Sequence, residues 1–247
     1  MLIITDLDKT LLKCDETISD YTIDVFQRVR ECGVLIAFAT GRSLESSQQY
    51  RSLLNPDGDI VTGGCLIFSG GQLLRSYYLP EPQGATLLEE LCAYPLIKIV
   101  SARSLNTAYS NIPREGRICV DFKSPLPEKL LHCSCRTDDD AFMKLIAARY
   151  PDFSFLRISG SDLYDINPKD ATKLNGVKII TEHFNISLSE VTAFGDDYND
   201  IEMLKQCGTG VAVANAIDEV KAVANYVCES NDEDGIARWL EERMLFF

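Results

Sequence analysis

The segment Leu2-Ile3-Ile4-Thr5-Asp6-Leu7-Asp8-Lys9-Thr10-Leu11-Leu12 opens with a short apolar run that ends at two closely spaced aspartates. A continuous apolar run of this length predicts a strand that is buried on both faces, as in a parallel sheet. A helix is expected next, because Ser19 is a candidate N-cap and Gly33 supplies a C-terminal stop. A second buried strand is expected over 34–39. Strands that alternate with helices predict a doubly wound α/β sheet with right-handed crossovers.

The alternation is interrupted in the middle of the chain. Proline and glycine residues break the pattern at 80–84, and short strand candidates then mix with two helices up to about Ser159. The strand-helix alternation returns after this stretch. We therefore expect an α/β core formed by residues 1–79 and 160–247, with an inserted α+β module at residues 80–159. The strand candidates of the insert are 96–100, 117–122, 130–135 and 153–158.

The composition excludes several classes of protein. The 247 residues carry 37 acidic against 24 basic side chains, a net charge of −13. This charge opposes binding to nucleic acid or to an anionic membrane, and no basic run compensates for it locally. The longest uncharged apolar stretch, 33–40, is far shorter than the ~20 residues that a membrane-spanning helix needs. No secretory signal is recognisable either, so we expect a cytoplasmic protein that binds neither nucleic acid nor membrane.

The cysteines and histidines do not indicate a disulfide framework or a zinc centre. Nine cysteines are scattered without a Cys-x-x-Cys pair, and their number is odd. The cluster His132-Cys133-Ser134-Cys135 lacks a second pair of ligands at suitable spacing, so we interpret it as part of a strand. The acidic runs at 138–140 and 231–234 each precede an apolar helical stripe and are interpreted as helix caps. Since the chain has only two histidines, catalysis is expected to depend on carboxylates.

Four polar segments lie where predicted strands end or a core helix begins. They are Asp6-Leu7-Asp8-Lys9-Thr10, Thr40-Gly41-Arg42, Lys173 and Gly195-Asp196-Asp197-Tyr198-Asn199-Asp200. Each segment alone is more often an ordinary turn or a solvated surface residue. Ligands of open α/β sheets bind beyond the carboxyl ends of the strands, so we expect the fold to gather all four segments at one sheet edge.

The charges of these segments indicate the kind of ligand. At 4 Å two like charges repel by about 4 kcal/mol at an effective dielectric constant of 20, so Asp6, Asp8 and Asp196 cannot all stay ionised without a counter-charge. A divalent cation supplies that charge, and oxygen ligands with retained waters suit Mg²⁺, which commonly bridges a phosphate to the protein. Lys173 and the backbone N–H groups near Gly41 suit the remaining phosphate charge. The segments therefore predict a site for a phosphoryl group.

In order and spacing, these four segments resemble the four motifs of the haloacid dehalogenase (HAD) superfamily. More narrowly, the chain resembles the Cof-like branch of that family, subclass IIB. Three further stretches support this: Pro168-Lys169-Asp170-Ala171-Thr172-Lys173, 210–216 and 231–237. The resemblance implies a Rossmann-like doubly wound parallel sheet with a large α+β cap domain inserted after the third core strand. The cap is expected to lie over the phosphate site and to select the substrate.

The resemblance also implies a role for each site residue. Asp6 is expected to attack phosphorus and form an aspartyl-phosphate, Asp8 to act as general acid and base, and Lys173 to neutralise the nucleophile. The expected phosphate-binding residues are Thr40, Gly41, Arg42, Lys173 and Asn199. The expected Mg²⁺-binding residues are Asp6, Asp8, Asp196 and Asp200, with Asp8 acting through its backbone carbonyl and Asp200 as a ligand or from just outside.

Two positions depart from the family's pattern. Lys9 stands where the family usually has a small residue, and Thr62-Gly63-Gly64-Cys65 stands where this branch usually has an Asn-Gly-Ala turn. Neither departure removes a catalytic group, and both can alter substrate choice. Polar or basic residues in cap loops and at strand ends are candidates for contact with the leaving group, with solvated surface as the alternative for each. They are Arg103, Tyr109, Arg114, Arg117 and Arg136.

The sequence thus predicts a Mg²⁺-dependent phosphatase that hydrolyses small phosphorylated metabolites, with sugar phosphates as the leading class. A sugar-phosphate mutase or phosphotransferase on the same scaffold is the enzymatic alternative, and the sequence does not separate the two. A non-catalytic phosphosugar-binding regulator is disfavoured because Asp6, Asp8, Lys173 and Asp196 are all present. The physiological substrate and the oligomeric state are left open.

Overall fold

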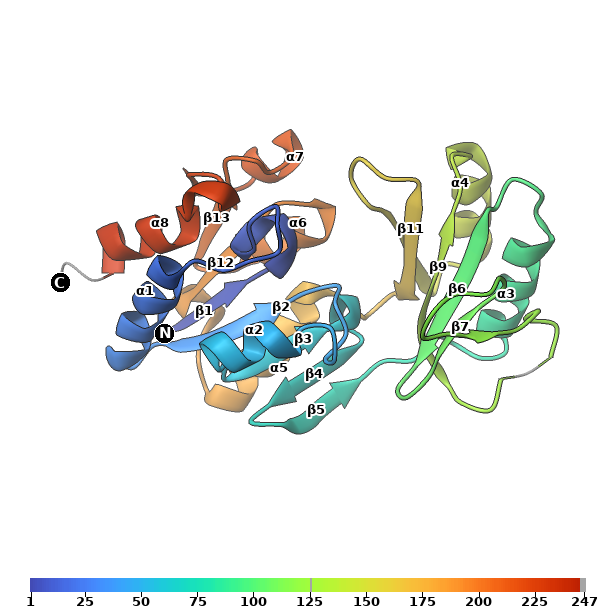
Figure 1. Ribbon diagram of the computed structural model, residues 1–247, viewed down its shortest axis with the longest axis horizontal. Helices are drawn as coiled ribbons and strands as arrows, with labels where there is room; N and C mark the ends of the chain where they lie inside the picture. The colour runs from blue at the N-terminus through green and yellow to red at the C-terminus, as the bar shows by residue number, and fades with distance from the viewer. Residues whose placement is uncertain (125, 245–247) are drawn as a thin grey trace. The chain divides into compact units, whose positions relative to one another are not determined.

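The computed structural model describes residues 1–124 and 126–244 (Figure 1). By its internal contacts the chain divides into two compact units. The core unit comprises Met1–Arg75 and the chain from Thr172 onward, and the inserted unit comprises Ser76–Ala171. Among the described residues, no helix has the length and apolarity that crossing a membrane requires. No disulfide links any two cysteines in this part of the chain.

An eight-stranded sheet forms the centre of the core unit, in the order β14-β13-β12-β1-β2-β3-β4-β5. The strands are β1 (Leu2–Thr5), β2 (Leu35–Ala39), β3 (Gly58–Val61), β4 (Leu66–Ser69), β5 (Gln72–Ser76), β12 (Val191–Gly195), β13 (Thr209–Val213) and β14 (Tyr226–Cys228). Neighbouring strands from β14 to β3 are parallel, whereas β4 runs antiparallel to β3. The chain passes from β5, at the edge of this sheet, into the inserted unit at Ser76.

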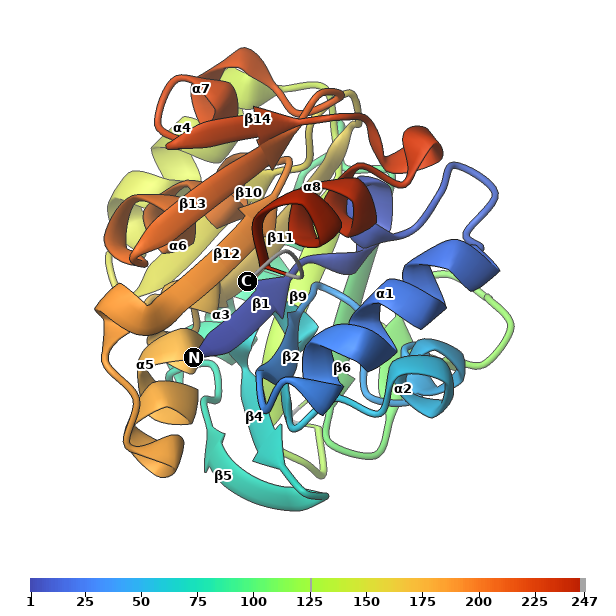
Figure 2. The same cartoon turned by 90° about the vertical axis from the view of Figure 1, so that its left-hand side faces the viewer.

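Helices cover both faces of this sheet (Figure 2). They are α1 (Asp20–Glu31), α2 (Gln48–Leu54), α5 (Lys173–Phe184), α6 (Ile201–Gln206), α7 (Asp218–Lys221) and α8 (Gly235–Met244). The helix α1 packs beside α2 and α8 on one side of the sheet, and α5 packs beside α6 on the other. This arrangement confirms the predicted doubly wound α/β core.

The first strand is buried as its composition predicts. Leu2, Ile3 and Ile4 have no exposed surface, because β1 lies between β12 and β2 in the middle of the sheet. Thr5, the last residue of β1, is in register with Phe194 of β12. The chain therefore leaves β1 and β12 at the same sheet edge, and the residues after both strands are brought together there.

Local chemistry sets the bounds of α1. The Ser19 hydroxyl oxygen accepts a hydrogen bond from the backbone N–H of Thr22 at 3.1 Å, which satisfies one of the free donors of the first turn. At the other end Gly33 has a φ of +78°, a conformation that costs a glycine little. Both signals were readable in the sequence.

The inserted unit contains a six-stranded sheet, in the order β10-β11-β9-β6-β7-β8, and two helices. Its elements are α3 (Gln83–Ala93), β6 (Ile99–Ser104), β7 (Ala108–Ser110), β8 (Ile118–Cys119), β9 (Leu130–Arg136), α4 (Asp140–Arg149), β10 (Phe153–Arg157) and β11 (Leu163–Pro168). Apolar side chains of both helices and one sheet face form its core, among them Leu87, Leu91, Val100, Cys133 and Ile146. Asp139 caps α4 by accepting the backbone N–H of Phe142 at 2.9 Å, as the acidic run predicted.

The limits of the inserted unit differ from the expected residues 80–159. The unit begins at Ser76 and extends to Ala171, so the core does not resume at residue 160. The reason is β11 (Leu163–Pro168), which pairs antiparallel with β10 on one side and β9 on the other. The strand expected over 117–122 is also shorter, since β8 comprises only Ile118–Cys119.

Candidate active site

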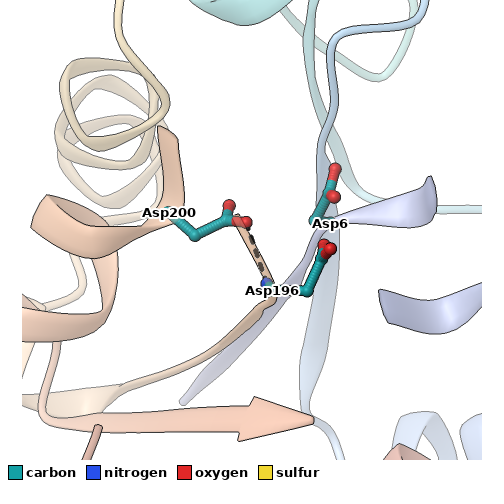
Figure 3. A group of neighbouring side chains, drawn as sticks. All are labelled: Asp6, Asp196 and Asp200. Carbon is teal, nitrogen blue, oxygen red and sulfur yellow. Dashed lines mark hydrogen bonds between the residues drawn. The ribbon is translucent and has the colours of Figure 1, made fainter. Parts of the chain in front are cut away.

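Three buried carboxylates meet where the chain leaves β1 and β12. Oxygen atoms of Asp6, Asp196 and Asp200 lie within 4.8 Å of one another. Asp6 follows β1 directly, and its backbone N–H donates to the carbonyl oxygen of Phe194 at 3.1 Å, which fixes it beside the loop after β12. Figure 3 shows the side chains of Asp6 and Asp196 side by side, with Asp200 reaching the same place from the end of that loop.

Lys173 is the cation of this cluster. It is the first residue of α5, and its Nζ atom lies 2.9 Å from Asp6 Oδ1 and 2.7 Å from Asp200 Oδ1. The Thr172 hydroxyl caps α5 by accepting the backbone N–H of Asn175 at 3.1 Å, which holds Lys173 at the helix start. Gly64 approaches the same turn so closely that a Cβ atom there would lie 2.6 Å from the Thr172 backbone. A glycine is thus required at this position.

The cluster carries more negative than positive charge. Burial raises the pKa of Asp6 well above its usual value, and burial raises the pKa of Asp196 to about 6. Burial alone would lower the pKa of Lys173, but its ion pairs with Asp200 and Asp6 raise it above the usual value. One lysine cannot balance three ionised carboxylates, so the folded chain favours either protonation or a bound cation at this place.

Asp200 is engaged by the protein itself on both oxygens. Oδ1 accepts a hydrogen bond from Lys173 Nζ, and Oδ2 accepts hydrogen bonds from the backbone N–H groups of Asp196 at 3.0 Å and Asp197 at 3.2 Å. The residue has no exposed surface. A side chain at Gly195 would collide with Asp200, so glycine permits this close packing. Asp200 therefore organises the loop that presents Asp196.

The turn after β1 fixes the orientation of the Asp196 side chain. Its Oδ1 atom accepts a hydrogen bond of 2.6 Å from the hydroxyl of Thr10, which is also buried. Thr10 lies in the turn after β1, within a short π-helical segment at Leu7–Leu11 in which Lys9 has a φ of +59°. The turn after β1 thus orients Asp196, a candidate metal ligand in the loop after β12.

The side chain of Asp8 is exposed, in contrast to the three buried carboxylates. Arg42 binds it through two nitrogens, Nε at 3.0 Å from both carboxylate oxygens and Nη2 at 2.6 Å from Oδ1. The Arg42 guanidinium also lies 3.2 Å from Glu16 and stacks 5.1 Å from the ring centre of Tyr50. Hydrogen bonding to Asp8 is the main reason why the pKa of Arg42 is raised. The structure thus places the Arg42 guanidinium on the Asp8 carboxylate.

The remaining phosphate-binding candidates sit in loops of the core unit. Thr40 is buried directly after β2, and its hydroxyl accepts the backbone N–H of Arg42 at 3.1 Å. Gly41 is exposed, with open space where a side chain would be. Among the described residues, the buried Oδ1 atom of Asn199 and the buried Oγ1 atom of Thr62 have no hydrogen-bond partner. Unpartnered polar atoms of this kind suit a ligand.

A family model described as haloacid dehalogenase-like hydrolase matches residues 3–240. The chain belongs to this family. The phosphatase YitU of Bacillus subtilis, named for 5-amino-6-(5-phospho-D-ribitylamino)uracil, is 29% identical, and the match spans 98% of this chain and 96% of that protein. An HMP-PP phosphatase of Klebsiella pneumoniae is 28% identical over 88% of this chain and 85% of that protein.

The solved structures support the same assignment. The structure described as the HAD subclass IIB sugar phosphatase BT4131 superposes with a TM-score of 0.86 and 25% identity, covering 98% of each chain. Together with the named relatives, this HAD-like hydrolase is identified as a phosphoric monoester hydrolase, and the predicted family and fold are confirmed.

The candidates in the inserted unit of this HAD-like hydrolase divide into two groups. Tyr109 is buried in the unit's apolar core, and the guanidinium of Arg136 pairs with the Asp162 carboxylate. Within the described residues, no ion pair or side-chain hydrogen bond involves the guanidinium groups of the other three candidates, Arg103, Arg114 and Arg117.

Sequence reasoning missed three residues that hold the site. Besides Thr10, the side-chain amide of Asn215 donates to the carbonyl of Lys9 at 2.6 Å. The side-chain amide of Asn231 donates to the carbonyl of Leu12 at 2.8 Å, and its backbone N–H donates to Asn215 at 3.0 Å. The two asparagines lie in stretches that supported the family resemblance, which was the one available signal. Through these hydrogen bonds the two asparagines fix the conformation of the turn after β1.

Proposed function

We propose that the protein is a Mg²⁺-dependent phosphatase that hydrolyses small phosphorylated metabolites, sugar phosphates in particular, through an aspartyl-phosphate at Asp6. The observation that supports this most strongly is the buried group of three carboxylates with a single lysine. A buried cluster with an excess of negative charge costs stability, and a divalent cation bound there would remove that excess before an anionic phosphoryl group enters.

The donor set fits Mg²⁺. All candidate ligand atoms are oxygens, and only a few carboxylates are present, as suits an ion that keeps some of its waters. Asp6 and Asp196 are the side chains that would bind it, because Asp200 already uses both oxygens within the protein. Bound there, Mg²⁺ would offset the negative charge of the phosphoryl group as the nucleophile approaches.

Asp6 is the proposed nucleophile. Its Oδ1 atom is held by Lys173, so the carboxylate has a fixed orientation, and its other oxygen would attack phosphorus. The bond between phosphorus and the leaving oxygen breaks as the new bond to Asp6 forms. Water then attacks the aspartyl-phosphate, which releases inorganic phosphate and restores the carboxylate. Lys173 faces the negative charge of the nucleophile throughout and is buried, where its charge acts most strongly.

Asp8 is the proposed general acid and base. Its side chain is more exposed than those of Asp6 and Asp200, and the two hydrogen-bonding nitrogens of Arg42 fix the direction of its carboxyl group. It would give a proton to the leaving oxygen in the first step and take one from the attacking water in the second. Thr40, Gly41 and Asn199 are the proposed contacts for the phosphoryl oxygens.

Phosphate release from p-nitrophenyl phosphate and from sugar monophosphates tests this function. We expect release to require Mg²⁺ and to fall by at least about 10³-fold in Asp6→Asn. Asp15→Asn is the matched control, because Asp15 is an exposed aspartate that makes only local hydrogen bonds to Thr17. Undiminished Mg²⁺-dependent release by Asp6→Asn contradicts the proposal. With a sugar bisphosphate, constant total organic phosphate would instead identify a mutase.

A further inference from the structure

Thr62, the first residue after β3, has a backbone conformation that suits few side chains. Its φ is +53°, and Gly63 and Gly64 continue the turn with φ values of +65° and +102°. Glycine adopts such angles at little cost, whereas a β-branched side chain is strained by them. Among the residues that the structure describes, Thr62 is the only β-branched residue with a positive φ. The protein therefore has a threonine where the backbone favours it least.

The hydroxyl group of Thr62 does not offset this strain within the folded chain. Thr62 is 3% exposed, and its Oγ1 atom is buried without a hydrogen-bond partner in the described part of the chain. A buried hydroxyl whose hydrogen bonds are not made destabilises a fold. Other buried threonines have partners: Thr10 donates to Asp196, and Thr181 donates to the carbonyl oxygen of Lys178 at 2.9 Å. Two unfavourable features thus occur in one residue, and such residues cluster at ligand sites.

Thr62 lies at the sheet edge that carries the candidate active site. Asp6, Thr40 and Thr62 are each the first residue after a strand, namely β1, β2 and β3. These strands are adjacent and parallel, so their carboxyl ends reach the same edge. Neighbouring strands are about 4.8 Å apart, which puts the backbone of Thr62 about 10 Å from that of Asp6. A phosphate ester held at Asp6 can bridge this distance together with the two side chains.

Backbone contacts hold Thr62 between two segments of the candidate site. Its N–H donates to the carbonyl oxygen of Arg42 at 2.7 Å. Two residues further on, Gly64 packs directly against the backbone of Thr172, the N-cap of α5. The turn is therefore fixed between the loop after β2 and the start of α5, where Lys173 lies. All of these residues belong to the core unit.

We propose that the Thr62 hydroxyl hydrogen-bonds an oxygen atom of the bound phosphate ester, on the phosphoryl group or on the leaving group. This contact satisfies the buried hydroxyl and accounts for a threonine in a turn that suits glycine. Thr62 is then a substrate-binding residue of the core unit, in addition to Thr40, Gly41 and Asn199. The inference rests on the proposed phosphatase function.

Three substitutions separate the hydroxyl group from the backbone strain. Thr62→Ser keeps the hydroxyl and removes the β-branch, Thr62→Val keeps the β-branch and removes the hydroxyl, and Thr62→Gly removes both. Activity should follow the hydroxyl. In the full-length protein with Mg²⁺, kcat/KM for a hexose monophosphate should fall by about tenfold in Thr62→Val and Thr62→Gly and stay within about threefold in Thr62→Ser.

Stability should follow the backbone and the buried hydroxyl. Without substrate, the Tm of Thr62→Gly should exceed that of the wild type, because glycine relieves the positive φ. The Tm of Thr62→Val should not fall, because this substitution removes a buried hydroxyl that has no partner. Thr181→Val is the matched control, since the Thr181 hydroxyl is also buried but donates to the Lys178 carbonyl. It should leave kcat/KM unchanged and should not raise the Tm.

Inhibition by inorganic phosphate identifies the oxygen atom that Thr62 contacts. A contact with the phosphoryl group should raise the Ki of phosphate in Thr62→Val by a factor similar to the loss of kcat/KM. A contact with the leaving group should leave this Ki unchanged. It should also lower kcat/KM more for the hexose monophosphate than for p-nitrophenyl phosphate, whose leaving group has no sugar hydroxyls.

Unchanged kcat/KM and phosphate Ki in Thr62→Val overturn this inference. Equal losses of activity in Thr62→Ser and Thr62→Val overturn it too, as does a Tm of Thr62→Val that falls together with the activity, because both results assign Thr62 a purely structural role. Failure of the proposed function has a different signature, since the wild type itself would then release no phosphate in a Mg²⁺-dependent way.

Discussion

Replacing Asp196 by Asn should stabilise the metal-free protein while it removes the binding of Mg²⁺. In the folded chain Asp196 shares a buried site with Asp6 and Asp200, and burial raises its pKa from 3.8 to about 6. Two pKa units correspond to about 3 kcal/mol, which is the cost of keeping this carboxylate ionised at neutral pH without a cation. Asparagine has the same shape and can still accept the hydrogen bond from Thr10.

The expected gain is about 1–3 kcal/mol, because burying the amide N–H₂ group offsets part of the relief. Thermal melting at pH 7.5 in EDTA should therefore show an increase of a few degrees in Tm. The pKa of Asp196 is raised in the folded state, so its stabilising contribution is complete below about pH 3.8 and is lost as the pH rises through 6. The difference between variant and wild type should accordingly shrink as the pH is lowered through 6.

Asp200→Asn is the matched comparison, with the same substitution in the same loop. Asp200 pairs with Lys173 and accepts two backbone N–H groups, so its replacement removes one of the two ion pairs of a buried lysine and should destabilise the fold by about 3–5 kcal/mol. Mg²⁺ should raise the Tm of the wild type and not that of Asp196→Asn. A Tm of Asp196→Asn below that of the wild type in EDTA, or an equal response of both proteins to Mg²⁺, would refute the reasoning.

Three further outcomes follow from the same contacts. Mg²⁺ affinity, measured by calorimetry, should weaken by about tenfold for each pH unit below about 6, since a proton then competes for Asp196. An affinity that does not change between pH 7.5 and pH 5 contradicts this. Gly64→Ala should lower the free energy of unfolding, measured with denaturant, by about 2 kcal/mol or more, because its Cβ atom would lie 2.6 Å from the Thr172 backbone. Gly70→Ala is the control: this glycine also has a positive φ but has open space around it, so the variant measures the cost of positive φ alone. Asn231→Ala should lower the free energy of unfolding by about 1–3 kcal/mol, because the buried carbonyl of Leu12 loses its hydrogen-bond donor. The variant should also lower kcat more than it raises KM, because the turn that carries Asp8 loosens. Unchanged kinetics would show that the turn keeps its conformation without Asn231.

The core of the fold could be predicted because its signals are local. An apolar run buried on both faces, an N-cap such as Ser19 and a stop such as Gly33 each act within a few residues of chain. The strand β11 (Leu163–Pro168) was not predicted, because its place in the inserted sheet depends on pairing with β9, whose residues lie about thirty positions earlier. Such long-range pairing leaves little trace in the composition of the strand itself.

The grouping of the three carboxylates and the lysine was predictable to a similar degree. The convergence of Asp6, Lys173, Asp196 and Asp200 follows from which strands are neighbours, and the sheet order places their loops together. The pairing of Asp8 with Arg42 did not follow, because it joins two side chains 34 positions apart in the chain and leaves no local signal in either segment.

Trapping the proposed phosphoryl acceptor tests the central claim most directly. Beryllium fluoride forms a complex with carboxylates that mimics an acyl phosphate, and a crystal structure grown with it and Mg²⁺ would show which side chain is modified. The account predicts the fluoride complex on the carboxylate of Asp6, with Mg²⁺ between it and Asp196. A complex on Asp8, on another residue, or Mg²⁺ bound away from these two aspartates would contradict it.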